Sequence, residues 1–378
     1  MLLPLLRLAW LVPIRPSSAS QAVPRVDARA LDRSALLAHM RAGPLLLTHA
    51  LADGSALETW ADRLVEHAAA ARVEVQVRRG RSTELREVTL SGACELAYAS
   101  HHSEWSLLFD ERLVSARAPQ LERELALRPG LFEPDWFEAH FPPELRPSRT
   151  CVIVGGEGAR STLHADPFEW VGTNVCLEGR KLWRFLPPEP ELSAQLRGYR
   201  LPSIAWGSQG GALSAGWQSD FDLYATRRAG APGARALRDS ARADEQLRAM
   251  ADVRTGLLRP DARLPADAAR RLVGCVQRAG ELLLIPPGWW HQSYYPEPSF
   301  CAAGQYLDSF CRASVFQHVL DWTRTGRRAD EIDASLRPQE QVDALFALVR
   351  SSASARAADE ADAPGAHGPI AGRAGRKS

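Results

Sequence analysis

The sequence predicts a mainly β fold with added helices, whose core is a small antiparallel barrel or sandwich. The main observation is a change of pattern at residue 150, after which short apolar runs alternate with glycine and proline. A second observation is the helical spacing of apolar residues on both sides of this region. The strand-like runs are TCVIVGG, STLHADP, GTNVCLEG, KLWRFLPP, LVGCVQRAG, ELLLIPPGWWH and FCAAGQYL.

The composition is that of a globular protein. Of the 378 residues, 45% are hydrophobic, which allows a substantial core and argues against global disorder. The 46 basic and 45 acidic residues give a net charge of +1, without the basic excess of a nucleic-acid binder. The six cysteines show no C-x-x-C spacing, so we interpret them as small buried hydrophobic residues. Disulfides remain an alternative if the protein is secreted.

Residues 1–25 are interpreted as a targeting segment. They begin MLLPLLRLAWLVPI, which is too short to span a bilayer, and contain no aspartate or glutamate. Ser18-Ala19-Ser20 suits a signal-peptidase site, whereas the arginines suit an organelle transit peptide. The compartment therefore stays open between the secretory pathway or an organelle and, without targeting, the cytoplasm or nucleus. We expect a soluble protein with no membrane span.

Residues 26–149 are expected to form a helical and strand lead-in. SALLAHMRAG ends in a glycine that stops a helix, and SALETWADRLVEHAAAA has helical spacing. PLLLTHA indicates a short buried strand, and VEVQV at 73–77 alternates as a strand does. Residues 104–141 mix aromatic and acidic residues with short helical patterns.

The predicted barrel at 150–308 is interrupted by residues 189–270, which are rich in Arg, Ala, Gly and Pro and show little strand character. We interpret them as a surface insertion, either tolerated decoration or a substrate-facing lid, with a helix at 239–253. Residues 309–350 return to helix, and their apolar stripes predict packing or a homodimer surface. Residues 351–378 are predicted to be a disordered tail, because they contain almost no large apolar groups.

His164 and Asp166 are candidate metal ligands, because a strand would place both side chains on one face. A bare H-x-D also occurs as a hydrogen-bonded pair. His291 follows a Pro-Pro-Gly turn at the start of another strand. Of the ten histidines, only it and His164 lie in the Gly/Pro-punctuated strand region. The three residues together match the two-histidine, one-carboxylate triad of non-haem Fe(II) oxygenases.

Lys181 is a candidate for holding an anionic co-substrate. Oxygenases of this type use 2-oxoglutarate, whose far carboxylate needs a cation. We expect the strand of Lys181 to lie beside that of His164, and a lysine inside a barrel is costly unless an anion pairs with it. Arg180 and Arg184 are rivals on the opposite face of the strand, and the pattern does not decide which face is inside.

These runs resemble the Jumonji-C (JmjC) dioxygenases of the cupin superfamily, especially small members that hydroxylate proteins. The family shows Ser/Thr-x-x-His-x-Asp, then Gly-x-Lys-x-x-x-hydrophobic-Pro-Pro, then Gly-Glu/Asp-hydrophobic-Pro-x-x-Trp-x-His. STLHADP, GRKLWRFLPP and GELLLIPPGWWH follow that order here. The resemblance covers 150–188 and 272–308 well and 43–145 loosely. It implies a double-stranded β-helix, or jelly-roll, core that uses Fe(II), 2-oxoglutarate and O₂.

The resemblance also implies roles for single residues. His164, Asp166 and His291 correspond to the iron ligands, and Lys181 to the lysine that pairs with the distal carboxylate of 2-oxoglutarate. The remaining cofactor contacts that it implies are a hydroxyl at Ser161 or its rival Thr162, and amides at Asn174 and Gln305.

The predicted function is therefore an Fe(II)- and 2-oxoglutarate-dependent oxygenase that hydroxylates a side chain of a protein or peptide. Hydroxylation is favoured because the chain shows no zinc or reader module and is not basic. Demethylation of N-methyl-lysine or N-methyl-arginine is one alternative, and an inactive cupin-fold scaffold is another. Candidates for an apolar wall of the site are Trp170, Trp183, Trp289 and Trp290, although ordinary core packing is the better interpretation of each one taken singly.

Overall fold

The computed structural model describes most of the chain in two units. The two compact units are Met1–Val315 and Phe316–Ser378, and each is described by itself. The described residues are 22–52, 57–80, 82–101, 104–143, 146–200, 204–206, 211–213, 217–224 and 261–362.

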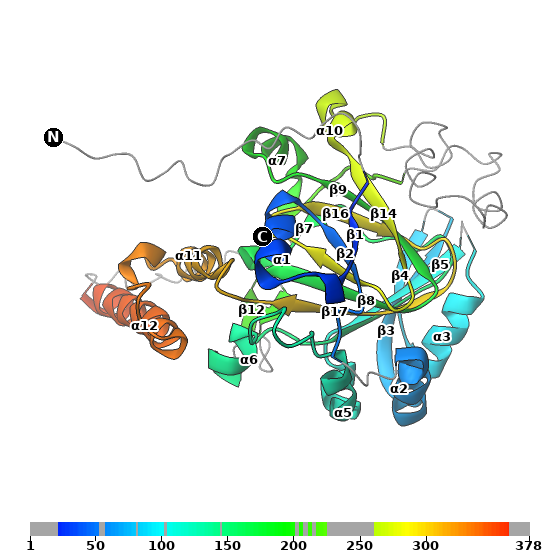
Figure 1. The fold of residues 1–378 in the computed structure, drawn as a ribbon, viewed down its shortest axis with the longest axis horizontal. Helices are drawn as coiled ribbons and strands as arrows, with labels where there is room; N and C mark the ends of the chain where they lie inside the picture. The colour runs from blue at the N-terminus through cyan, green and yellow to red at the C-terminus, as the bar shows by residue number, and fades with distance from the viewer. Residues whose placement is uncertain are drawn as a thin grey trace, which may run out of the picture. The chain divides into compact units, whose positions relative to one another are not determined.

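A nine-stranded sheet forms the larger wall of the first unit (Figure 1). Its neighbours pair antiparallel, except that β1 and β2 are parallel. In spatial order the strands are β1 (Arg25–Asp27), β2 (Leu45–Thr48), β15 (Leu282–Ile285), β8 (Val171–Glu178), β17 (Ser299–Tyr306), β6 (Cys151–Gly155), β5 (Glu104–Asp110), β3 (Arg72–Arg79) and β4 (Ser82–Thr89).

A six-stranded sheet forms the smaller wall, and side chains from both sheets line the cavity between them. Its strands in spatial order are β10 (Tyr199–Arg200), β13 (Trp217–Gln218), β7 (His164–Ala165), β16 (Trp290–Tyr294), β9 (Arg180–Leu186) and β14 (Val273–Arg278). A further two-stranded sheet pairs β11 (Ile204–Trp206) with β12 (Gly211–Leu213).

Eight of these strands follow the connectivity of a jelly roll. Strands β6, β8, β15 and β17 belong to the larger sheet, and β7, β9, β14 and β16 to the smaller one. The chain therefore crosses from one sheet to the other at almost every connection, and the apolar faces of both sheets are buried against each other. The predicted fold class, mainly β with a jelly-roll core and added helices, is confirmed.

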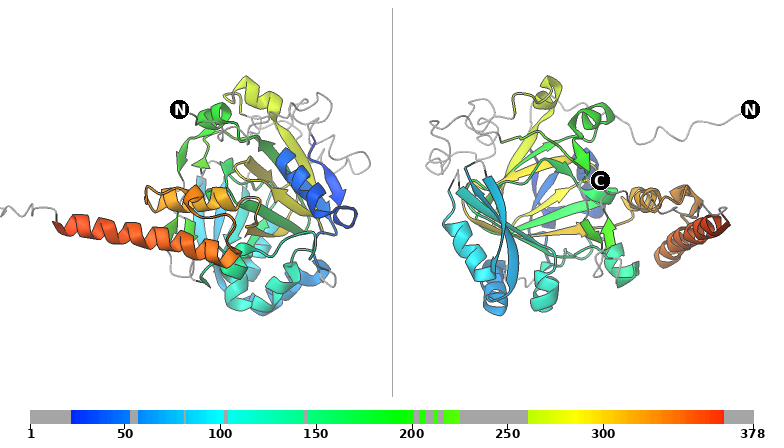
Figure 2. Two further views of the ribbon diagram at one scale, coloured as in Figure 1. Left: turned by 60° about the vertical axis from the view of Figure 1, so that its left-hand side comes forward. Right: turned by 180° about the vertical axis from the view of Figure 1, so that it is seen from behind.

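The lead-in does not form a separate layer, because its strands extend both edges of the larger sheet. β1 and β2 join beside β15, while β5, β3 and β4 continue the sheet beyond β6. The predicted strands at 44–50 and 73–77 are confirmed as β2 and β3. Strand β5 was not predicted, since its aromatic and acidic residues also suit short helices. The right-hand view in Figure 2 shows α3 (Leu90–Tyr98, cyan) against β3, β4 and β5, which it contacts.

The helices begin and end where capping residues allow. Asp32 accepts a hydrogen bond from the N–H of Ala35 at the start of α1, and Gly43 ends that helix with φ +154°. The helices are α1 (Arg33–Ala42), α2 (Trp60–Ala68), α3 (Leu90–Tyr98), α4 (Leu113–Arg117), α5 (Pro119–Glu122), α6 (Trp136–His140), α7 (Pro190–Leu196), α10 (Ala266–Arg271), α11 (Arg312–Trp322) and α12 (Pro338–Asp362). Short 3₁₀ turns are η1 (Ala28–Ala30), η2 (Leu57–Thr59), η3 (Arg123–Leu125), η5 (Pro167–Glu169) and η6 (Ala329–Glu331).

Three expectations drawn from the sequence are wrong in part. The first part of the tail expected from residue 351 is helical, because α12 continues to Asp362 through an alanine-rich stretch of high helix propensity. The rest of that tail, residues 363–378, lies outside the described residues. The segment 1–25 overlaps the fold at its end, where Val23 is buried and Arg25 starts β1. The rest of that segment, residues 1–21, lies outside the described residues.

The third correction concerns residues 189–270. Their described parts contain α7, β10, β11, β12, β13 and the first residues of α10. Leu192, Leu223 and Leu264 enter the same buried cluster as Trp290, so the ends of the insertion are part of the core. These very short strands left no alternating pattern in the sequence, and each forms only through pairing with another strand, such as β13 with the more distant β7. The helix expected at 239–253 lies outside the described residues.

Two further expectations concern cysteines and membranes. All six cysteines are free, and all except the half-buried Cys94 are buried, as predicted for small hydrophobic residues. In the described part of the chain, no helix combines the length and the apolar character needed to cross a bilayer.

Strand β2 provides a test of the packing. Leu46 is fully buried between Leu283 of β15 and the other residues of its cluster, whereas Leu85 on edge strand β4 is 65% exposed. We expect Leu46→Ala to lower the free energy of unfolding by about 2–5 kcal/mol, through lost burial and the cavity that remains. Leu85→Ala, the matched control, should change it by less than about 0.5 kcal/mol. Urea unfolding followed by circular dichroism measures both, and equal effects would contradict the described packing.

Candidate metal centre

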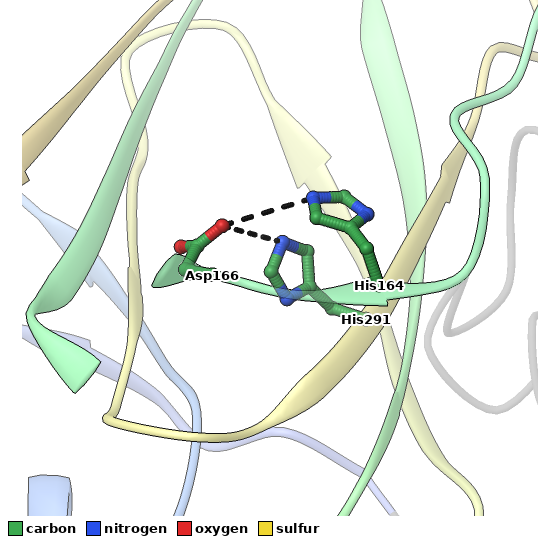
Figure 3. Close-up of side chains that lie close together, drawn as sticks. All are labelled: His164, Asp166 and His291. Carbon is green, nitrogen blue, oxygen red and sulfur yellow. Dashed lines mark ion pairs between the residues drawn. The ribbon is translucent and has the colours of Figure 1, made fainter. Parts of the chain in front are cut away.

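Strands β7 and β16 bring the three predicted ligands together. His164 and His291 are direct partners in the antiparallel pairing of these strands, with ring centroids 4.1 Å apart. Asp166 follows β7 in extended backbone, φ −60° and ψ 148°, so its carboxylate turns toward both imidazoles (Figure 3). One ligand atom from each of the three residues lies within 4.8 Å of the others.

The three side chains do not hydrogen bond one another. Asp166 Oδ1 is 3.7 Å from His164 Nε2 and 3.6 Å from His291 Nε2, both beyond hydrogen-bond range (Figure 3). Burial lowers the pKa of His291 to about 4, with further lowering by His164, so this imidazole is neutral at pH 7 and forms no ion pair. Three donors around a common point, without bonds between them, are arranged as metal ligands are.

Both imidazoles are fixed by the main chain. His164 Nδ1 lies 2.8 Å from the carbonyl of Thr162, and His291 Nδ1 lies 3.0 Å from the carbonyl of Trp289. A neutral imidazole that donates from Nδ1 carries its lone pair on Nε2, the nitrogen that faces Asp166. Each histidine is therefore oriented as a ligand by a carbonyl two residues before it.

Asp166 is held by its own loop and by strand β8. A β-carbon at Gly172 would lie 2.6 Å from Asp166 Oδ2, so only glycine leaves room for the carboxylate. After Asp166 the chain turns sharply, with Phe168 and Glu169 at φ 59° and 53°. Such left-handed backbone is strained for these residues. The rings of the buried Phe168 and Trp170 stack at 5.7 Å and support this turn.

Lys181 points into the cavity and is only 1% exposed. Its ammonium lies 4.3 Å from the ring centre of Trp183 and 4.9 Å from that of Tyr295. Among the described residues no carboxylate pairs with it, and burial lowers its pKa. A buried cation supported only by aromatic faces leaves room for an anionic guest.

The expectation that the strand of Lys181 lies directly beside the strand of His164 is wrong. Strand β16 lies between β7 and β9, so Lys181 is separated from His164 by the strand of His291. The sequence suggested direct adjacency because the two strands are close along the chain, but jelly-roll crossings separate them in the sheet. Lys181 on β9 still faces the same cavity as His164, although one strand lies between them.

The four remaining predicted cofactor contacts all line this cavity, but their surroundings differ. Ser161 Oγ accepts the N–H of Ser293, whereas Thr162 contacts the triad through its carbonyl, which bonds His164. Asn174 is 2% exposed, and its Oδ1 receives no hydrogen bond from any described residue. The Oε1 of Gln305 is likewise buried without a donor.

The other face of β9 carries the two arginines that rivalled Lys181. Arg180 forms an ion pair with Glu297, and the buried Arg184 donates to the carbonyl of Leu223 and lies over the ring of Tyr224. Both point away from the cavity. Of the four candidate tryptophans, Trp170 and Trp183 line the cavity, Trp289 packs at Gly43, and Trp290 lies in the core with its N–H on Ser193.

Several residues at the site were not predicted. Ser293 and Tyr295 share the face of β16 with His291, so the period of two could have identified them. Gln277 is fully buried on β14, where it accepts the Trp183 indole N–H and donates to the carbonyl of Asn174. No motif marks Gln277, because its role depends on the pairing of β14 with β9.

Residues 217–224 of the insertion form one wall of the site. Gln218 pairs with His164 across β13 and β7, and the residues 218–222 line the cavity. The segment is held from the other side, because Gln292 accepts the N–H of Leu223 and Arg160 donates to the carbonyl of Tyr224. This part of the insertion is therefore a fixed component of the site.

The site as a whole is a cavity of about 870 Å³ between the two sheets. It places the three candidate metal ligands together and the buried Lys181 side chain on strand β9 of the smaller sheet. Such a combination of a concave site with convergent polar groups is typical of ligand-binding centres.

Comparison with known proteins agrees with this fold. The family model of the Cupin-like domain matches residues 37–295. Lysine-specific demethylase JMJ21 from Arabidopsis thaliana is 38% identical over 81 residues, which are 21% of this chain and only 8% of that protein. The family match includes the whole triad and Lys181. The chain belongs to the Cupin-like domain family, of the JmjC type.

Proposed function

We propose that this chain is an Fe(II)- and 2-oxoglutarate-dependent oxygenase that hydroxylates a side chain of a protein. The observation that carries the proposal is the group of His164, Asp166 and His291, whose ligand atoms converge within 4.8 Å in the cavity that contains Lys181. Membership of a JmjC-type cupin family supports the broader class of Fe(II)/2-oxoglutarate oxygenases.

The donor set fits Fe(II). Two imidazole Nε2 atoms and one carboxylate oxygen suit non-haem iron and leave coordination positions open toward the cavity. When bound, Fe(II) and 2-oxoglutarate would supply the activation of O₂ that oxidises a substrate C–H bond. The carbonyls of Thr162 and Trp289 keep both histidines in the binding tautomer without any change of side chain.

Lys181 fits the far carboxylate of 2-oxoglutarate. Its burial without an anionic partner is unfavourable by itself, and a bound carboxylate would offset that cost. Ser161 would offer a hydroxyl to the same anion, with Thr162 as the less suited rival because its side chain is exposed. Asn174 and Gln305 would turn their amides toward the metal-bound end.

The tryptophans on the cavity wall would exclude water from the reacting groups. Trp183 covers Lys181, and Trp170 lies on the side of Asp166. An apolar wall strengthens the charge interactions of Lys181 and protects the oxidising centre from side reactions.

Demethylation is the second candidate, and the relative named as a lysine-specific demethylase favours it. The two reactions share the oxidation of a C–H bond. Hydroxylation of an N-methyl group is followed by loss of formaldehyde, whereas a hydroxylated side-chain carbon retains its oxygen. Hydroxylation stays the first candidate, because the match to the demethylase spans 8% of that protein.

Loss of one ligand tests the proposal. We expect His164→Ala to weaken Fe(II) binding by more than about 100-fold, since even supporting residues of metal sites contribute 10- to 100-fold. His101→Ala, at an exposed histidine, is the matched control. Anaerobic Fe(II) titration measures binding, and succinate formation from 2-oxoglutarate measures turnover. Absence of turnover in the wild-type protein, or equal turnover in His164→Ala, would disprove the proposed oxygenase activity.

Peptide mass analysis then distinguishes the two candidate reactions. Hydroxylation adds one oxygen to the peptide, whereas demethylation removes a methyl group and releases formaldehyde.

The co-substrate contact is tested on strand β9. Lys181→Met should raise the KM for 2-oxoglutarate by roughly 10- to 100-fold, the equivalent of one hydrogen bond to a charged group. Arg180→Met is the matched control, because Arg180 is the neighbouring cation on the opposite face. Initial rates at varied 2-oxoglutarate concentration give the KM of each variant. An unchanged KM in Lys181→Met would exclude this lysine from co-substrate binding.

A further inference from the structure

The cavity of the candidate metal centre contains a carboxylate that no described residue neutralises. Glu111 follows directly after β5 and is half-buried on the cavity wall. Among the described residues its side chain has no ion pair or hydrogen bond, and burial raises its pKa despite the opposing charge of Arg112. Asp222 differs, because Arg160 and Gln292 both bind it.

An exposed aromatic ring lies beside this carboxylate. Phe109 is two residues before Glu111, so both side chains leave the same face of the strand and line the cavity. Phe109 is 54% exposed, which is unusual for a large apolar side chain in this protein. A ring face next to a carboxylate suits the apolar stem and cationic head of arginine or lysine.

The strand order fixes how far Phe109 and Glu111, at the end of β5, lie from the metal centre. Strand β8 touches Asp166 through Gly172, and β17 and β6 separate β8 from β5. Three strand spacings amount to about 15 Å. An extended peptide rises about 3.3 Å per residue, so about four to five residues span this distance.

We propose that Glu111 and Phe109 recognise an arginine or lysine side chain of a polypeptide substrate. The recognised residue lies about four to five positions from the oxidised one in an extended peptide. This inference rests on the proposed oxygenase function, which places the oxidised residue at the metal. Arg78 also lines the cavity, but its positive charge is too far away to repel the recognised arginine or lysine. Arg78 pairs with Trp105 at the other end of β5, about 20 Å from Glu111.

The experiment measures peptide binding to the full chain loaded with Mn(II) and N-oxalylglycine, redox-inactive substitutes for Fe(II) and 2-oxoglutarate. Each peptide of the library fixes arginine, lysine, glutamate or alanine at one position and randomises the others. Wild-type protein should prefer arginine or lysine to alanine at one position by roughly tenfold, the effect of one charged hydrogen bond. Glu111→Gln should lose this preference, and Glu111→Arg should reverse it toward glutamate.

Glu104→Gln is the matched control, since Glu104 lies on the same strand but on the opposite face. Thermal unfolding of each variant checks its fold, and a reversed preference in Glu111→Arg cannot result from unfolding. A missing preference in the wild type, or one retained in Glu111→Gln, overturns the proposal. Succinate formation by wild-type protein without peptide is measured in parallel. If it occurs while the preference is missing, the substrate inference alone fails; if it does not occur, the proposed function fails.

Discussion

The pairing of His164 with His291 is the contact on which the site depends. Strand β7 contains only two residues and is held between β13 and β16, so its position is set by its neighbours. That pairing aligns two imidazoles whose Nδ1 atoms are already bound by backbone carbonyls. The ligand geometry is thus a property of the main chain, which makes it rigid before any metal binds.

A second constraint is the burial of polar groups that have no partner among the described residues. In that part of the chain Lys181 contacts aromatic faces but no carboxylate, and Asn174 and Gln305 each have an acceptor that receives no hydrogen bond. Such groups are destabilising in a closed core. Because these groups line one cavity, the interior of the jelly roll is suited to binding polar ligands.

Segments outside the jelly roll shape the access to that interior. Strands β5, β3 and β4 extend the larger sheet, while the segment 217–224 forms the wall next to His164. Arg184 and Gln292 bind the backbone of that segment, so its place is determined by the outer face of the barrel. Segments that a rigid scaffold positions in this way often carry binding residues.

Local pattern was enough to identify the main barrel strands after residue 150 and to single out His164, Asp166 and His291, because the period of two is a property of neighbouring residues. The family resemblance, rather than the pattern, selected Lys181 over Arg180 and Arg184. It did not reveal that β16 separates β7 from β9, that Gln277 orients Trp183, or that Gln218 pairs with His164. Those relations join residues far apart along the chain, and short strands carry too little pattern to specify their partners. The sequence by itself determined which side chains are available; the tertiary structure decided which of them meet, because sheet pairing and burial depend on the whole chain.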